Sequence, residues 1–165
     1  METQKASSTN EKVLVKNLID LIEKENAHAS LAAALKDIPF KLLGEKIHGL
    51  PYSIWQLAEH IRIAQWDIME FSKSAKHKSP DWPDDYWPKE VAPASEKEWE
   101  KCIEQIKKDR KEFVELLNNA GDDLYKPFEH GDGQSLLKEA LVIADHNSYH
   151  TGEIIMLRRL LNAWK

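Results

Sequence analysis

The chain has 165 residues, 42% of them hydrophobic, which is enough for one domain with its own core. Its 23 basic and 28 acidic residues give a formal net charge of −5, and the basic residues are scattered, so nucleic acid is not the expected partner. No apolar run approaches the roughly 20 residues that span a bilayer, and the polar segment 1–10 lacks the apolar stretch of a secretory signal. The single cysteine, Cys102, cannot form an intrachain disulfide, so a cytoplasmic location is expected.

The first part of the chain predicts two helical pieces. Segment 1–10 is expected to be disordered, and apolar residues then recur at three- and four-residue steps from 11 to about 25, as on a helix with one buried face. A second piece over 29–36 continues the pattern and stops near Pro39, because a proline ring disfavours helix in the residue before it. The glycines and proline that follow indicate a loop.

Three further helices are predicted, each preceded by a serine that can cap its N-terminus. Ser53 precedes an apolar stripe that runs to Phe71, Ser95 precedes a heptad-like pattern that ends near Gly121, and Ser135 precedes a helix that runs to about Trp164. Strand-like alternation is rare in the chain. The expected fold class is therefore an all-α helix bundle, in one domain over residues 11–165.

A segment without periodicity, 72–95, joins the second and third of the main predicted helices. It contains four prolines and exceeds the roughly 12–15 residues beyond which structureless loops are uncommon. A connection between two parallel helices has to cross the length of the bundle, about 30 Å for 20 helical residues. Its aromatic residues, among them Trp82, Tyr86 and Trp87, indicate that this crossover packs onto the bundle.

Two histidines in the last predicted helix, His146 and His150, are four residues apart. They lie about 40° apart on the helix and one turn apart along it, so both imidazoles can bind one ion. A third ligand has to come from another helix, and His60 is the best candidate. The alternative is that His150 and the neighbouring Asn147 are core residues that hydrogen-bond each other or the backbone, which is the more frequent case for an isolated pair. Both interpretations stay open on spacing alone.

Acidic and amide residues near these histidines are candidates for supporting roles. Glu153, seven residues after His146, lies on nearly the same face, where its carboxylate could orient a ligand, bind metal or act as a general base. A solvated surface glutamate is the more common case. Gln56 and Asp67, four residues before and seven after His60, are similarly placed on their helix.

Three separated segments, SIWQLAEHIRIAQ, DWPDDYWP and HGDGQSLLKEALVIADHNSYHTGEIIMLRRLLNAW, resemble the DinB-like (DinB/YfiT) superfamily. The resemblance extends over nearly the whole chain, from the first helix to Trp164. It implies a four-helix bundle of up-down-down-up topology with a long crossover between the second and third helices. It also implies three histidine ligands, His60, His146 and His150, for a divalent ion, with nickel or zinc expected.

The resemblance also implies a range of functions. Characterised relatives include metal-dependent thiol S-transferases and hydrolases, while many members have no assigned reaction. The expected function is therefore a metal-dependent transferase or hydrolase that acts on a small-molecule substrate such as a thiol or an amide, with Glu153 as the candidate base. The alternatives are a bundle that binds a metal or small ligand without catalysis in a stress response, and a purely structural bundle. Homodimers are common among such bundles, so a homodimer is compatible with this assignment.

Two further residues are candidates for lining the pocket. His28 lies at the break in the first helix, in the phrase HASLAAAL, which resembles the superfamily pattern, although a partly exposed histidine is the more economical interpretation. Trp82, in a cluster with Tyr86 and Trp87, could form a wall of the pocket, although packing of the crossover is the more frequent use of such residues. Cys102 is expected in the core and is given no catalytic role.

Overall fold

The structure, a computed structural model, describes residues 2–164, with side chains from residue 9 on, and its regular secondary structure is helical. The helices are α1 (Glu2–Glu23), α2 (Leu31–Leu35), α3 (Ile54–Lys73), α4 (Glu96–Asn119) and α5 (Leu136–Leu160), with 3₁₀ helices η1 (Phe40–Leu42), η2 (Asp84–Tyr86) and η3 (Gly121–Tyr125). Within these described residues there is no strand, only an isolated bridge between Pro127 and Ser135. The predicted all-α class is confirmed.

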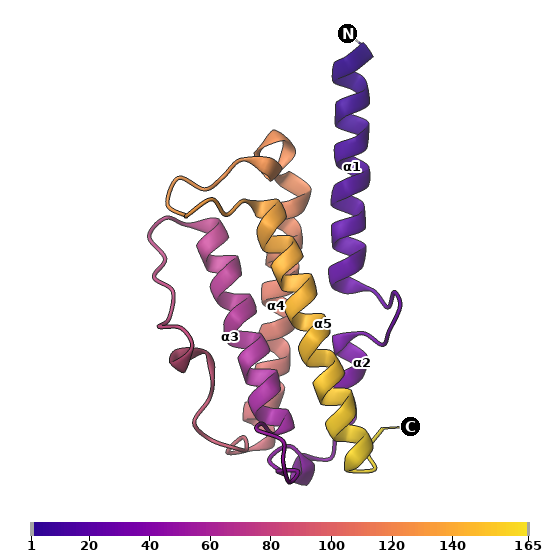
Figure 1. Cartoon of the computed structure of the whole chain (residues 1–165), viewed down its shortest axis with the longest axis vertical. Helices are drawn as coiled ribbons and strands as arrows, with labels where there is room; N and C mark the ends of the chain where they lie inside the picture. Colours follow the sequence, from indigo (N-terminus) through magenta and orange to yellow (C-terminus); the bar gives the residue numbers. More distant parts are fainter. Residues whose placement is uncertain (1, 165) are drawn as a thin grey trace.

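Four long helices lie side by side in the molecule (Figure 1). In that view α3 and α4 run upward, whereas α1 and α5 run downward, and the connection between α3 and α4 descends along the outer side of α3. The upper part of α1 extends beyond the other helices. Among the described residues, no helix is both long enough and apolar enough to cross a membrane.

The three predicted serine caps are present. Ser53 accepts a hydrogen bond from the backbone of Gln56 and the Gln56 side chain accepts one from Ser53, which completes a capping box at the start of α3. Ser95 and Ser135 accept the corresponding backbone N–H groups at the starts of α4 and α5. These caps satisfy donors that a helix end would leave unpaired, so the starts of these helices were predictable.

Two helices end at other residues than expected. The structure begins α1 at Glu2, ahead of the start expected at residue 11, and segment 2–10 contains no proline or glycine that would interrupt a helix. At the other end, α5 stops at Leu160 and does not reach Trp164. Asn162 adopts a left-handed φ of 55°, and the next N–H bonds back to the carbonyl of Arg158 at 2.7 Å, which is a Schellman stop.

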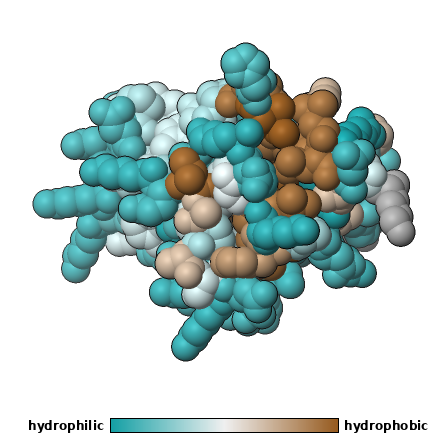
Figure 2. Space-filling model, turned by 90° about the horizontal axis from the view of Figure 1, so that it is seen from below, coloured by the Kyte–Doolittle hydropathy of each residue, from teal (hydrophilic) through white to brown (hydrophobic). Residues whose placement is uncertain are grey.

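The buried residues form two apolar clusters, one at each end of the bundle. One joins α2 to the first half of α3, the first half of α4 and the second half of α5. The other joins α1 to the opposite halves of α3, α4 and α5. Between them, at the middle of α3 and α5, lie buried polar residues, among them His60, Gln65, His150 and Thr151. The surface also exposes hydrophobic residues on one side of the end where α5 finishes (Figure 2).

Helix α2 is held against α5 by a buried arginine. Arg158 is 6% exposed, and its guanidinium donates to the carbonyls of Ala33 and Ala34 and to that of Ala163, at 3.3, 2.7 and 2.9 Å. The carbonyl of Ala33 also accepts the N–H of Lys36, whereas that of Ala34, at the end of the helix, depends on the guanidinium for its hydrogen bond.

Candidate metal centre

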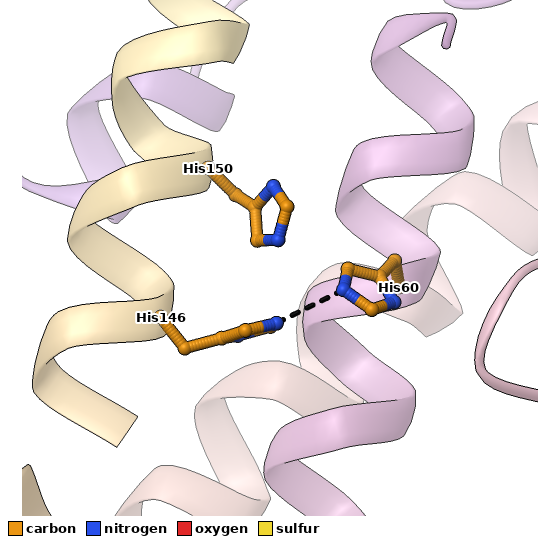
Figure 3. Close-up of side chains that lie close together, drawn as sticks. All are labelled: His60, His146 and His150. Atoms are coloured by element: carbon orange, nitrogen blue, oxygen red, sulfur yellow. Dashed lines mark hydrogen bonds between the residues drawn. The ribbon is translucent and has the colours of Figure 1, made fainter. Parts of the chain in front are cut away.

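Three imidazoles converge between α3 and α5 (Figure 3). His60 comes from α3, and His146 and His150 come from successive turns of α5. One ligand nitrogen of each lies within 4.8 Å of those of the other two, and the Nε2 atoms of His60 and His146 are 2.9 Å apart. His60 and His150 are 2% and 6% exposed, while His146 is partly exposed. The spacing of four residues on α5 therefore does bring both imidazoles to one point.

Hydrogen bonds on the far side of two imidazoles fix which nitrogen faces the centre. His60 donates from Nδ1 to the carbonyl of Tyr86 at 2.8 Å. His150 donates from Nδ1 to the carboxylate of Glu153 at 2.7 Å. Because a neutral imidazole carries one hydrogen, both rings keep a lone pair on Nε2. Protein metal sites commonly orient their histidine ligands in this way.

Burial keeps the three histidines in the neutral form that binds metal. Loss of solvation, followed by the proximity of another histidine, lowers the pKa of His146 and of His150 to about 4, from 6.5. Loss of solvation likewise lowers the pKa of His60. The three imidazoles therefore carry no charge at neutral pH, so a cation is not repelled and meets no competition from protons.

The crossover covers His60 with aromatic rings. Trp87 stacks on the imidazole of His60, with ring centroids 3.8 Å apart and planes 3° apart. Tyr52 stacks on Trp87, also at 3.8 Å and with planes 9° apart. This column of three rings shields one face of the site from water and holds the imidazole plane of His60.

Polar contacts attach the crossover to α3 on both sides of this column. On one side, the buried carboxylate of Asp67 accepts hydrogen bonds from the hydroxyl of Tyr86 at 2.6 Å and from Nε2 of His77 at 2.7 Å. On the other side, the side chains of Ser53 and Gln56 donate to backbone carbonyls of the crossover at 2.6 and 3.4 Å. The Tyr86 carbonyl that orients His60 is thus part of a firmly attached segment.

An amide chain satisfies the polar groups on the inner side of α5. Asn147 donates to Gln65 at 3.1 Å, and Gln65, which is 1% exposed, donates to the carbonyl of Ile106 at 2.7 Å. Asn147 is also 3.5 Å from Nδ1 of His146. The buried polar residues at the middle of α5 are therefore satisfied partly by these amide hydrogen bonds and partly by the histidine cluster.

The structure brings Glu153 to the histidine cluster and leaves the other two predicted pocket residues away from it. His28 is exposed, contacts Ser148 at 3.0 Å, and lines a separate cavity of about 410 Å³ between α1 and α5. Trp82 is 71% exposed and meets only the edge of the Tyr86 ring, at 5.1 Å. The aromatic ring on the site is that of Trp87.

Among the described residues, Gln56, Asp67 and Cys102 make no hydrogen bond to the three histidines of the site. Gln56 acts in the capping box, and Asp67 reaches the site only through Tyr86. Cys102 is 3% exposed within the apolar cluster that contains α2, and burial raises the pKa of its thiol. It lies in the core, as expected, and has the properties of an unreactive thiol.

The fold and the site together define an all-helical protein with three imidazoles converging between two of its helices. The family model for the DinB superfamily matches residues 24–154. The chain therefore belongs to the DinB superfamily. A search of curated proteins found no match, and a search of solved structures found none either.

Proposed function

We propose that this protein is a metal-dependent enzyme of the thiol S-transferase or hydrolase type, in which His60, His146 and His150 hold a divalent ion, nickel or zinc. In this proposal the four long helices form the up-down-down-up bundle implied by the family resemblance. The observation that carries the proposal is the pair of Nδ1 hydrogen bonds, to Tyr86 and to Glu153, that leave Nε2 of two converging imidazoles available as ligands.

The donor set suits such an ion. Imidazole nitrogen is a preferred ligand of zinc, nickel, copper and iron, and catalytic zinc sites commonly have three protein ligands with a further position for water or substrate. A bound divalent ion supplies Lewis acidity, which lowers the pKa of a thiol or water that it binds and polarises an electrophile. The partial exposure of His146 supports access to the site from solvent.

The side chains around the site have separate tasks in this proposal. The Tyr86 carbonyl and the Glu153 carboxylate hold two imidazoles, and Trp87 excludes water from one face. Glu153 is also the proposed base. Its Oε2 atom bonds His150, which leaves Oε1 to accept a proton from a substrate thiol or water, and burial raises its pKa, which makes it a better proton acceptor.

A bundle that binds the ion without catalysis is the competing function. The burial of His60 and His150 favours it, because a catalytic ion needs a position that substrate can reach. The two functions predict the same metal content and differ only in whether a reaction depends on the ion.

Metal analysis tests the site itself. Protein purified without an affinity tag should carry about one divalent ion per chain, and His150→Ala should abolish the binding. His48→Ala is a matched control, because His48 is exposed in a loop, and it should keep the full metal content. Equal metal content in His150→Ala and the parent protein would refute the site.

A substrate panel then separates enzyme from binder. Thiol transfer to electrophiles and hydrolysis of small amides and esters should be assayed in metal-free and reloaded protein. The proposal expects at least one reaction that appears on reloading and is lost in His150→Ala. Full metal binding with no metal-dependent reaction across the panel would favour the competing function.

A further inference from the structure

A groove of about 290 Å³ lies between α5 and the residues that lead into α3. Its walls are largely apolar, with Leu50, Leu57, Met156 and Leu157 among them. This volume is close to the lower end of the roughly 300–1,000 Å³ typical of small-molecule pockets. The groove can therefore take a small apolar group, and it differs from the cavity lined by His28, which lies between α1 and α5.

Three residues of the groove contact the histidine site directly or through one ring. Glu153 bonds His150 at 2.7 Å, and the ring of Tyr149 packs edge-on against that of His150, with centroids 4.9 Å apart. Tyr52 stacks on Trp87, which in turn stacks on a histidine ligand. A molecule in the groove is thus separated from His150 by the single side chain of Glu153 or Tyr149, and from His60 by two stacked rings.

A glycine in the interior of α5 keeps the groove open. Gly152 lies well inside the helix, where glycine is unfavourable because of its conformational freedom. A Cβ atom added there would meet no atom within 4 Å, and the residue has no left-handed φ, so neither packing nor backbone conformation requires glycine. Gly152 lines the groove, and a larger side chain at this position would project into open space there.

The charge of the groove excludes one class of ligand. Among the described residues that line the groove, Glu153 has the only charged side chain and none is a lysine or arginine; the nearby ammonium of Lys46 is bonded to the backbone carbonyl of Pro51. Apolar residues at and beside the groove are exposed to solvent, with Leu50, Met156 and Leu160 at 38%, 53% and 52%. Hydrophobic residues also gather on one side of the surface at the end of the bundle seen in Figure 2.

We infer that this groove binds the apolar part of an uncharged small-molecule substrate and holds its reacting end beside the three histidines. The part of this inference that concerns the reaction rests on the proposed function. Binding of the apolar part in the groove does not, and it can be measured without any ion. The substrate class is a neutral alkyl or aryl compound that carries the reacting thiol, amide or ester.

The neutral fluorophore N-phenyl-1-naphthylamine is a suitable probe, because its emission rises in an apolar site. Full-length protein should bind it saturably. Gly152→Leu, which fills the groove, and Met156→Asp, which places a charge in it, should each weaken binding by about tenfold or more. Leu141→Asp is the matched control for the second variant, since Leu141 is a similarly exposed apolar residue of α5, at 45%, outside the groove. It should bind the probe as the parent does.

The sulfonated relative 8-anilinonaphthalene-1-sulfonate tests the charge argument with nearly the same rings. It should bind about tenfold or more weakly than the neutral probe, because a sulfonate would lie near the Glu153 carboxylate. Equal or tighter binding of the anionic probe would overturn the inference about charge. Unchanged binding of the neutral probe in Gly152→Leu would overturn the inference about place.

Cobalt loading tests the position of the groove relative to the histidines. Emission of the bound neutral probe should be quenched in protein loaded with Co²⁺ and not in protein loaded with Zn²⁺. Metal binding without probe binding would refute this inference and leave the proposed function standing, whereas probe binding without metal binding would refute the proposed function. The parent protein could instead form a dimer that does not bind the probe, while Met156→Asp is a monomer. That result would show that a second copy covers the groove, and it would also overturn the inference.

Discussion

Replacing Glu153 by glutamine should weaken zinc binding by roughly tenfold, or about 1.4 kcal/mol. The amide oxygen of glutamine can still accept the hydrogen on Nδ1 of His150, so the orientation of the ring survives and only the charge is lost. The side chain of Glu153 is 36% exposed, so solvent already screens part of that charge. Glu153→Leu removes the acceptor as well and should weaken binding by nearer a hundredfold, or about 2.7 kcal/mol.

Competition titration against a chromogenic zinc chelator at pH 7.5 measures these affinities. Asp145→Asn is the matched control, because it removes the same charge next to His146, and no hydrogen bond joins Asp145 to an imidazole. Its affinity should stay within about threefold of the parent value. If Glu153→Gln binds zinc no more weakly than Asp145→Asn, then Glu153 does not support the site through His150.

Three further predictions concern stability. In metal-free folded protein the pKa of His146 and of His150 is about 4, against 6.5 ordinarily. Below about pH 7 the unfolded chain therefore binds more protons than the folded chain. The free energy of unfolding, measured with urea in the presence of a chelator, should therefore decrease from pH 7 toward pH 4 by up to roughly 3 kcal/mol for each imidazole. The decrease should be smaller in His150→Gln. An equal dependence on pH in the variant and the parent would contradict this. Tyr86→Phe leaves a buried carboxylate on α3 with one hydrogen bond fewer and should cost about 1–3 kcal/mol in urea unfolding, so unchanged stability would show that this bond contributes nothing. Arg158→Met leaves the carbonyls of Ala34 and Ala163 without the guanidinium, while that of Ala33 keeps the N–H of Lys36, and should cost about 3 kcal/mol, which corresponds to a fall in melting temperature of roughly 6–12 °C. Its exposed neighbour Arg159→Met should change the melting temperature little, and equal effects of the two would refute the role of Arg158.

Features governed by local geometry could be predicted from the sequence. The caps at Ser53, Ser95 and Ser135 follow from side-chain chemistry next to an apolar period, and the pairing of His146 with His150 follows from the helical repeat. Asn162 is a stop signal for α5 that was available in the sequence, since asparagine tolerates a left-handed φ. The participation of His60 was different, because nothing local specifies which face of α3 meets α5. The position of His60 in its helix made it a candidate, and the family resemblance supplied the reason to prefer it.

Features of the crossover could not be predicted from pattern. A segment without period has no rule that assigns its side chains to an inner or outer face, so Trp82 and Trp87 were equivalent on the sequence. The contact from Tyr86 to His60 is made by a backbone carbonyl, which every residue has, and its place depends on how the whole crossover lies on α3. The position of His28 likewise depends on the angle at which α1 meets α5, which its sequence does not specify.

The long separation of the three histidines along the chain bears on when a metal ion would be acquired under the proposed function. His60 and His146 are 86 residues apart, and closing a loop of that length in the unfolded chain costs about 4 kcal/mol of chain entropy. In a zinc finger the ligands are close in sequence, and folding waits for the metal. Here two apolar clusters join α3 to α5 through contacts that do not involve an ion. The scaffold can therefore accumulate while metal is scarce, and supply of the ion would regulate occupancy of the site without regulating the amount of folded protein.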